Sequence, residues 1–389
     1  MKVVCMLLLL AVSLAFFACG AGSKSTPTPP ATLGGTGGTG GTGGSGGSGG
    51  GGTGGGGTAT TAALAYTVGP NDASISGIRV ASNNTAAPVG ASPFNSPSPV
   101  RYFAMTDKFL FASNFQNSVI GQTTITTYSI DANGGLASVS STNLQGGGFI
   151  RVDPSGQFLY AAQWVQQAGD SFGVPAIYGY SISANGALLP VPGSPWIPSA
   201  GETIGPLAVS STNVCADFAA GHANDLVFCY PRRSDGSLDI ASGVMVNNTN
   251  GVTDMAFSPD GSRLFMAGNS GVSVANMNAP TAPPTTLSAV GSFAAALAVD
   301  PSGQWLVVSN PQNRNISVFN LANTNATAGP TVSTSGVPGP VAFSKTGAYV
   351  FASTDAGVEV YSFDTTGGAL TPLSGSPVSG NSAGQIAAR

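Results

Sequence analysis

The sequence predicts an all-β protein, a seven-bladed β-propeller with four-stranded antiparallel blades whose ring is closed by the C-terminal strand. Two observations lead to this prediction. Apolar, β-forming runs that indicate a second strand return every 42 to 55 residues, and a tight-turn motif precedes several of them. Seven repeats of this length are typical of a propeller with four strands per blade. The runs can be anchored at Leu64, Leu110, Leu159, Val214, Leu264, Leu306 and Val350.

The tight-turn motif is clearest as Asp-Pro-Ser-Gly at residues 153–156 and 300–303. Weaker copies lie at 258–261 and 344–347. Pro presets φ at the second turn position, and Gly supplies a positive φ. Because β-forming residues flank every copy, the motif indicates a strand, a tight turn and a strand.

Two further signatures occur later in the units. Alternating apolar residues surround an Asn-Gly or Gly-Gly pair, which indicates a hairpin, at residues 128–136, 180–188 and 361–370. A Ser-Pro pair then follows, where Pro fits the end of an outer edge strand. These pairs occupy residues 92–93, 194–195 and 376–377.

The phase of the repeat predicts how the ring closes. No tight-turn motif precedes Leu64, so the chain enters its first unit at the second strand. Residues 385–388 resemble the first-strand text at 340–343. We therefore expect the C-terminal strand to complete the blade that residues 62–94 begin.

The composition restricts the classes of function. Charged residues make up only 7% of the chain, against a usual share of about a quarter. Gly, Ser, Thr, Asn and Ala take their places, which suits an extracytoplasmic β protein. The net charge of −4 and the lack of a Lys/Arg cluster argue against nucleic acid as a partner.

The N-terminal region predicts export. One Lys and a short apolar run make residues 1–18 a secretory signal peptide, because a membrane span needs about 20 apolar residues. Residues 16–19 resemble the lipobox of bacterial lipoproteins, which implies lipidation of Cys19; the alternative is an ordinary cleaved signal. Residues 19–61 are rich in Gly and indicate a flexible linker to the propeller at 62–389.

Two cysteines lie in one predicted hairpin. Residues 214–218 and 226–230 indicate its strands, and a hairpin centred on residue 222 places Cys215 opposite Cys229. Facing residues in an antiparallel pair are within disulfide range, and export provides an oxidising compartment. We expect a disulfide; two buried free thiols are the alternative.

The three repeated signatures together resemble the lactonase-like seven-bladed propellers, which include the propeller-type 6-phosphogluconolactonase and the carboxymuconate cyclase. The resemblance covers residues 62–389. It implies the propeller fold and, for the enzymes of the family, hydrolysis of a lactone. The family also holds members of non-catalytic role.

Lactone hydrolysis needs a base to activate water and a donor or cation for the developing oxyanion, and a carboxylate substrate favours Arg. The candidates lie in loops and strand entries that we expect on one face of the ring. Solvated surface charges, or an interblade ion pair for Arg151, are the alternatives. The candidate bases are His222, Glu202 and Asp254, and the candidate substrate-binding residues are Arg101, Arg151 and Arg314.

Three functions stay open at this point. The first is a membrane-anchored lactone hydrolase of the bacterial cell envelope. The second is a module that binds a small molecule, glycan or protein at the channel mouth, and the third is a structural envelope protein. No spacing of His and Cys indicates a metal site, and we expect no cofactor and a monomer.

Overall fold

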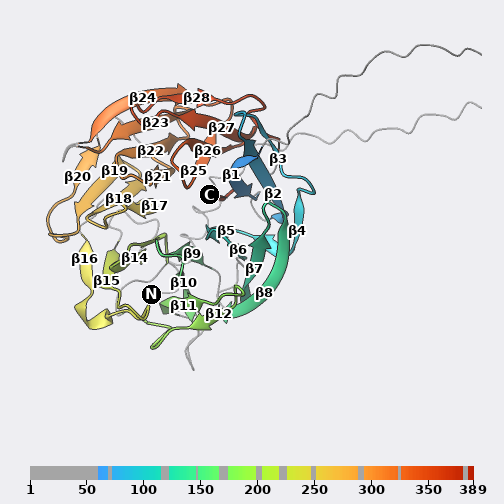
Figure 1. Ribbon diagram of the computed structural model, residues 1–389. Helices are drawn as coiled ribbons and strands as arrows, with labels where there is room; N and C mark the ends of the chain where they lie inside the picture. The colour runs from blue at the N-terminus through green and yellow to red at the C-terminus, as the bar shows by residue number, and fades with distance from the viewer. Residues whose placement is uncertain are drawn as a thin grey trace, which may run out of the picture. The chain divides into compact units, whose positions relative to one another are not determined.

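The described part of the protein forms a ring of β-sheets (Figure 1). The structure, a computed structural model, describes residues 60–68, 72–114, 122–145, 148–165, 174–198, 204–218, 226–246, 251–287, 293–322, 326–379 and 384–389. These residues build seven antiparallel sheets, so the predicted seven-bladed propeller is confirmed. The chain divides into a unit Met1–Gly56 and the propeller unit Gly57–Arg389.

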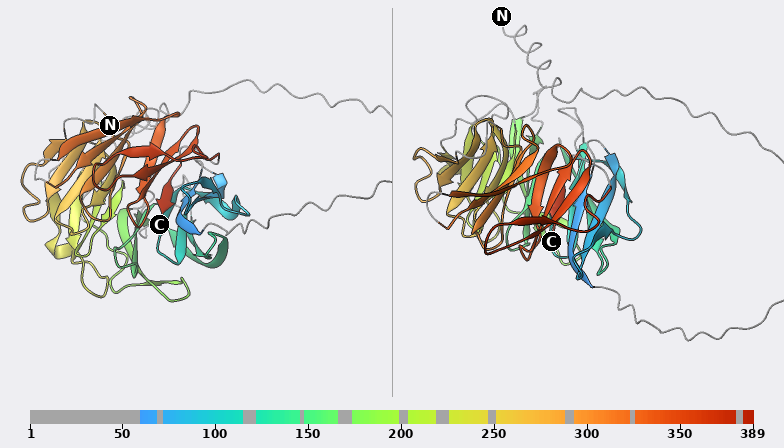
Figure 2. Two further views of the ribbon diagram at one scale, coloured as in Figure 1. Left: turned by 45° about the horizontal axis from the view of Figure 1, so that its top comes forward. Right: turned by 90° about the horizontal axis from the view of Figure 1, so that it is seen from above.

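Each blade runs from a first strand near the centre to a fourth strand at the circumference, and blades are numbered from the one that contains β1 (Figures 1 and 2). The first strands of blades 2 to 7 and then blade 1 are β5 (Tyr102–Met105), β9 (Phe149–Val152), β13 (Leu207–Val209), β17 (Val252–Phe257), β21 (Ala296–Val299), β25 (Pro338–Phe343) and β29 (Ile386–Ala388). In the same order, the second strands are β6 (Phe109–Ser113), β10 (Phe158–Val165), β14 (Asn213–Asp217), β18 (Arg263–Gly268), β22 (Trp305–Asn310), β26 (Tyr349–Thr354) and β1 (Thr61–Thr67).

The outer strands follow in the same blade order. The third strands are β7 (Gln122–Ile130), β11 (Val174–Ile182), β15 (Val227–Pro231), β19 (Gly271–Asn276), β23 (Asn315–Asn320), β27 (Gly357–Phe363) and β2 (Asp72–Ala81). The fourth strands are β8 (Leu136–Gln145), β12 (Leu188–Pro190), β16 (Val244–Val246), β20 (Thr285–Leu287), β24 (Thr327–Ser333), β28 (Leu370–Pro372) and β3 (Ala86–Pro88). Blade 1 adds β4 (Phe94–Val100), which pairs with β2, and a 3₁₀ turn, η1 (Ile240–Ser242), precedes β16.

The second strands are buried on both faces because each lies between two other blades. Consecutive residues of such a strand enter different cores: Leu110 packs between blades 1 and 2, and Phe111 packs between blades 2 and 3. The same alternation repeats around the ring, so each blade interface has its own apolar cluster. Apolar burial of this kind is the main source of fold stability.

One repeat anchor from the sequence is wrong by one residue. The other anchors face the last residue of their first strand, as Val350 faces Phe343. In blade 1 that position belongs to Ala65, which pairs with Ala388, whereas Leu64 enters the core toward blade 2. A shift of one residue moves a side chain to the other face of the strand. Leu64 was the expected anchor because it is a larger apolar residue than Ala65.

A side-chain cap explains the tight-turn motif. In blades 2 to 7, the residue after the first strand accepts a hydrogen bond of 2.7–3.1 Å from the N–H that opens the second strand. Asx and Ser/Thr turns of this kind fix the chain reversal locally. The sequence motif missed two turns, 106–109 and 210–213, because they are shorter and contain no Pro or Gly. The capping residues are Thr106, Asp153, Ser210, Ser258, Asp300 and Ser344.

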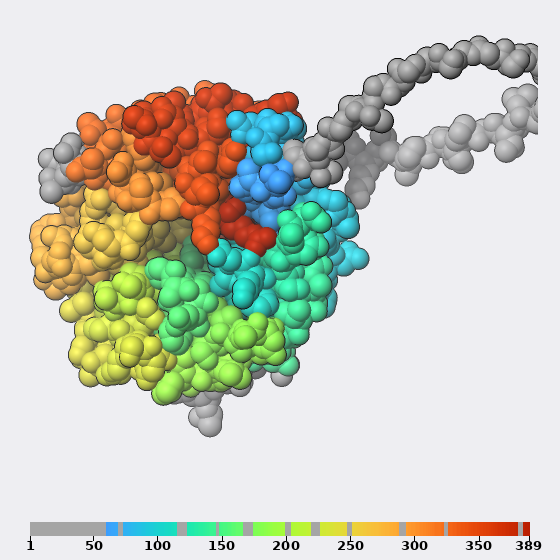
Figure 3. Space-filling model, viewed as in Figure 1, coloured from blue at the N-terminus to red at the C-terminus, as the bar shows by residue number. Residues whose placement is uncertain are grey.

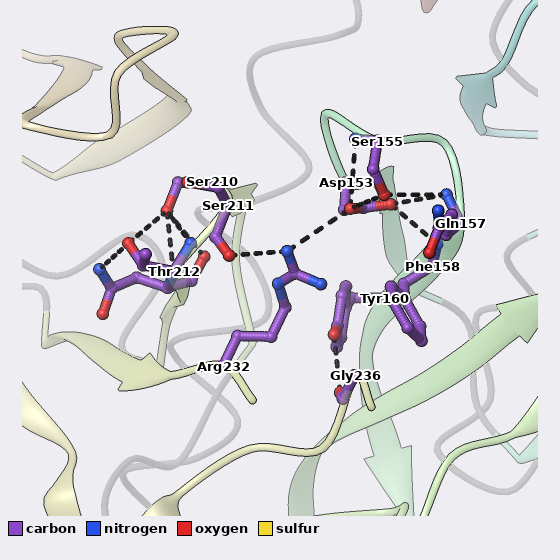
Figure 4. Close-up of polar contacts among 11 residues, drawn as sticks. Asp153, Ser155, Gln157, Phe158, Tyr160, Ser210, Ser211, Thr212, Arg232 and Gly236 are labelled. Atoms are coloured by element: carbon purple, nitrogen blue, oxygen red, sulfur yellow. Dashed lines mark hydrogen bonds and ion pairs between the residues drawn. The ribbon is translucent and has the colours of Figure 1, made fainter. Parts of the chain in front are cut away.

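The turn of blade 3 is also tied to blade 4 (Figure 4). The Arg232 guanidinium lies 3.6 Å from the Asp153 carboxylate and donates to the Ser211 carbonyl at 2.7 Å. Nearby, the Tyr160 hydroxyl donates to the Gly236 carbonyl at 2.7 Å. The Arg232 and Asp153 side chains are 9% and 0% exposed, so this pair is shielded from solvent and links two blades.

The hairpin glycines are needed for blade packing as well as for their positive φ. Gly236 has φ of 83°, and a Cβ there would lie 2.4 Å from the Phe158 ring of the preceding blade. Gly368 meets Trp305 in the same way, also at 2.4 Å. Only Gly combines this backbone conformation with so close an approach.

The Ser-Pro signature also has a local explanation. The hydroxyl of its Ser accepts a hydrogen bond from the main chain of the third strand in blades 1, 3 and 7. Ser92, Ser194 and Ser376 accept at 2.9, 3.0 and 2.9 Å from Gly77, Gly179 and Val360 respectively. The signature therefore ties the segment after the fourth strand back to the sheet.

The predicted hairpin register of the two cysteines is confirmed. Cys215 of β14 faces Cys229 of β15, and the two form a disulfide. Both side chains are fully buried between blades 4 and 5. The disulfide therefore crosslinks the two middle strands of one blade inside an apolar core.

The C-terminal strand closes the ring, as the repeat phase predicted. Ala388 pairs with Ala65 and Ile386 with Thr67, and Leu64 exchanges main-chain hydrogen bonds of 2.8 and 3.0 Å with Arg389. The Ile386 side chain is buried between blades 7 and 1. The last strand of the chain thus supplies the first strand of the first blade.

Deleting residues 385–389 should lower the free energy of unfolding by roughly 3–5 kcal/mol, because it removes a buried Ile and a strand's ladder. Urea denaturation of the full-length and truncated chains measures this. Gln385→Ala, which keeps the strand, serves as the control. Equal unfolding midpoints for the truncated and full-length chains would contradict the assigned closure.

Candidate functional site

The first strands enclose an axial channel. Adjacent first strands contact each other around the ring, from β5 through β9, β13, β17, β21 and β25 to β29 and back to β5. They leave a cavity of about 440 Å³, lined largely by apolar residues of β17, β21, β25 and β29. Arg151 and Asp254 are charged residues of its wall. Small-molecule sites usually have a wall of mainly apolar side chains with a small number of polar groups.

Arg151 departs from the pattern of the ring. In β9 it pairs with Tyr160, the residue that follows the anchor Leu159 in β10. In each of the other described first strands the equivalent residue is Ala. Four of these alanines line the channel, and the single Arg places a cation in its wall. The equivalent residues are Ala104, Ala208, Ala256, Ala298, Ala342 and Ala387.

Asp254 of β17 forms an ion pair with Arg151. The Arg151 Nη2 lies 3.0 Å from Asp254 Oδ1, although Arg151 belongs to blade 3 and Asp254 to blade 5. Asp254 also accepts hydrogen bonds from the main-chain N–H groups of Met255 at 2.9 Å and Leu297 at 3.2 Å. The side chains are 29% exposed for Arg151 and 18% for Asp254. The pair is therefore held in place yet partly open to the channel.

Burial dominates the electrostatics of the pair. Desolvation raises the pKa of Asp254 above its ordinary value, and the charge of Arg151 and the two N–H groups lower it only in part. A carboxylate with a raised pKa is a stronger base than one in water. Asp254 is thus suited to accept a proton from a bound water molecule.

Tyr102 extends the site toward blade 2. Its ring packs on Phe149, with 4.3 Å between the centroids. Burial raises the pKa of the Tyr102 hydroxyl, and the nearby charges of Arg101 and Arg151 lower it. The charges of both arginines therefore act on the Tyr102 hydroxyl. The sequence did not identify Tyr102, since an aromatic residue in a strand is usually part of the core.

The other sequence-predicted residues divide into two groups. Arg314 is exposed in the turn between β22 and β23, where its φ is 49°, and it is not part of the channel wall. Arg314 is thus not brought together with Arg151 and Asp254, and Asp254 is not a solvated rim charge. His222, Glu202 and Cys19 lie outside the described residues.

The described part of the chain has neither a cluster of metal-ligating side chains nor a helix that could span a membrane. No group of three or more His, Cys, Asp and Glu residues there could hold a metal ion. Among the same residues, no helix has the length and apolarity to cross a bilayer.

The fold and the channel define a class: a seven-bladed propeller with a partly exposed Arg–Asp pair in the wall of its axial channel. Residues 214–386 match the family model described as lactonase, 7-bladed beta-propeller. The resemblance to the lactonase-like propellers is therefore confirmed. No curated protein matches the sequence significantly.

Several solved structures share the fold. A Lactobacillus plantarum protein has a TM-score of 0.66 at 18% identity, covering 84% of this chain and 99% of its own. A Bacteroides uniformis protein assigned as a 6-phosphogluconolactonase has a TM-score of 0.64 at 15% identity, with 84% and 99% coverage. A Pseudomonas aeruginosa periplasmic gluconolactonase has a TM-score of 0.64 at 18% identity, with the same coverage of 84% and 99%. At these identities the likeness concerns the fold.

Replacing Arg151 with Gln should raise the pKa of Asp254 further, because it removes the largest interaction that lowers it. Carboxyl-carbon NMR titration of the full-length protein measures this pKa directly. The wild-type carboxyl should titrate above the ordinary 3.8, and the Arg151→Gln carboxyl higher still.

Arg314→Gln is the matched control, since it removes an exposed Arg outside the channel and should leave the titration unchanged. A lower Asp254 pKa in Arg151→Gln than in wild type would contradict the electrostatics described above. Ionising Asp254 also costs folding stability, because its folded pKa is raised, and this cost grows as pH rises through that pKa.

Proposed function

We propose that the protein is a lactone hydrolase that opens a sugar or aromatic lactone inside the axial channel. The observation that carries the proposal is the Arg151–Asp254 pair, which places a base and a cation together in the wall of the axial channel. The match of residues 214–386 to the lactonase family model supports it. So does the fold shared with a periplasmic gluconolactonase.

Asp254 acts as the general base. It removes a proton from a water molecule while the water oxygen attacks the lactone carbonyl. The ring C–O bond then breaks, and the leaving alkoxide takes up the proton that Asp254 removed from water. The product is a hydroxy acid, which at neutral pH ionises to its carboxylate and one released proton. The raised pKa of Asp254 favours the proton transfer, because a base is most effective when its pKa approaches the working pH.

Arg151 stabilises the negative charge that develops on the carbonyl oxygen, and its fork fits the carboxylate of the product. Arg101, whose charge also acts on the Tyr102 hydroxyl, is the second candidate for binding a substrate acid group. His222 and Glu202 remain candidate bases, whereas Arg314, exposed and outside the channel wall, takes no part in this proposal.

Asp254→Asn should reduce kcat/KM for the active lactone by about 10²–10⁴-fold, the usual contribution of a general base. Base uptake at constant pH, measured with full-length protein and a panel of gluconolactone, its 6-phosphate and dihydrocoumarin, follows the released acid. Arg314→Gln should keep wild-type activity, whereas His222→Gln and Glu202→Gln test the other candidate bases. No turnover above the buffer rate with any lactone would refute hydrolysis, and a fully active Asp254→Asn would refute this base.

A second candidate function, binding without catalysis, has one observation in its favour. Arg151 already has an anionic partner in Asp254, and the equivalent positions of the ring are alanine. A channel of this kind can hold a ligand by apolar contact and one ion pair. Saturable binding of a lactone or its acid without turnover would favour this function.

We further propose that the propeller is tethered to the bacterial cell envelope. Residues 1–18 would direct export, lipidated Cys19 would insert in the membrane, and residues 19–61 would span the distance to a propeller at 62–389. The disulfide between Cys215 and Cys229 supports an oxidising compartment, and the periplasmic gluconolactonase with the same fold agrees with an extracytoplasmic location.

Cys19→Ala should move the protein from the membrane fraction to the soluble extracytoplasmic fraction, because it removes the site of lipidation. Fractionation with immunoblotting, together with mass analysis of the N-terminal peptide, measures this change. Ser23→Ala, which keeps Cys19, is the control. A wild-type protein that is soluble, with an unmodified N-terminus after cleavage, would exclude the anchor.

A further inference from the structure

The two lysines of the propeller unit converge on one cavity. The chain has four lysines, Lys2, Lys24, Lys108 and Lys345, of which only the last two belong to the propeller. Lys108 comes from the first turn of blade 2 and Lys345 from the first turn of blade 7, yet both line the same cavity, and so does Arg389. In a chain with a net charge of −4, three cations at one cavity mark a local positive centre.

This cavity, called the vestibule here, has a volume of about 550 Å³ and lies where the tight turns meet the axis. Its wall combines the turns at 106–108 and 153–156 with the end of β29. It shares Met105, Lys345 and Ala388 with the axial channel and therefore adjoins it. Figure 3 shows this face, where the C-terminal segment in dark red meets blade 2 in cyan and blade 7 in red-orange beside a central hollow.

The acidic groups at the vestibule do not cancel its positive charge. Asp107 pairs with Lys345, but their side chains are 62% and 65% exposed, so this ion pair is weak and readily exchanged. Asp153 is fully buried, and its carboxylate is engaged by the N–H groups of its own turn and by Arg232. The Asp153 carboxylate is therefore not available at the vestibule surface.

Arg389 is positioned by main-chain contacts. Its guanidinium donates to the carbonyl oxygens of Asp107 and Asp131. These contacts hold the cation at the edge of the vestibule without neutralising it, because a carbonyl carries no net charge. A guanidinium and two ammonium groups around one cavity suit an oxyanion, which each of them can bind by a charge-assisted hydrogen bond.

We propose that the vestibule is a second binding site, separate from the Arg151–Asp254 pair, for a small anion that carries a phosphate or carboxylate group. Lys345 exchanges its partner Asp107 for the anion, Lys108 supplies a second ammonium, and Arg389 supplies the fixed edge of the site. The apolar side chains of Met105 and Val152 in the vestibule wall accommodate the uncharged part of the ligand. The proposal does not depend on hydrolysis in the channel.

Isothermal titration of full-length protein with inorganic phosphate and with gluconate, at low ionic strength, tests the proposal. Both probes should bind, and the ratio of their affinities shows whether the site prefers phosphate or carboxylate. Lys345→Gln and Lys108→Gln should each weaken binding about tenfold, as expected for loss of a charge-assisted hydrogen bond. Lys345→Arg should retain binding, and added NaCl should weaken it.

The controls separate the vestibule from other cations. Arg314→Gln removes an exposed Arg elsewhere and should leave the affinity unchanged. Lys108 and Lys345 are exposed, so their variants should keep the wild-type melting temperature, which is checked in parallel. The proposal is overturned by no binding of either probe, by equal losses in Arg314→Gln and Lys345→Gln, or by binding that disappears only in Arg151→Gln.

Discussion

The burial of each second strand between two neighbouring blades is the constraint on which the rest of the structure depends. Residues on opposite faces of one strand, such as Leu110 and Phe111, belong to different interblade cores, so no blade has a complete core of its own. The ring must therefore close, and strand β29 closes it by pairing with β1. The glycine hairpins and the Arg232–Asp153 contact serve this same packing of blade against blade.

The closed ring also determines where chemistry is possible. It brings seven first strands to one axis, and it makes alanine the suitable residue at the position that Arg151 occupies in blade 3. A single substitution of this kind places a charge in a sheltered cavity, and Asp254 two blades away provides its partner. Burial then raises the pKa of that carboxylate. The scaffold supplies the desolvation, and two side chains supply the reactive groups.

Most of the fold could be predicted from the sequence because turns and strand pairs are local. The positive-φ glycines, the Asp caps and the cysteine register are set by residues within about fifteen positions of each other. Two cases show the limit of this prediction. The anchor at Leu64 is one residue away from the equivalent position, Ala65. The turns at 106–109 and 210–213 lack the Pro and Gly of the motif but keep its side-chain cap. The Arg151–Asp254 contact joins residues that are 103 positions apart in the sequence and belong to blades 3 and 5, so no local pattern predicts it.

The function proposed for the axial channel requires that an acid group of the ligand meets Arg151 and Asp254 there. A crystal structure of the protein soaked with gluconate tests this most directly. We expect ligand density in the channel, with a carboxylate oxygen within hydrogen-bond distance of an Arg151 guanidinium nitrogen. The contact of Arg151 to Asp254 should then be lengthened or exchanged. An unchanged Arg151–Asp254 pair and an unoccupied channel at saturating gluconate would contradict it.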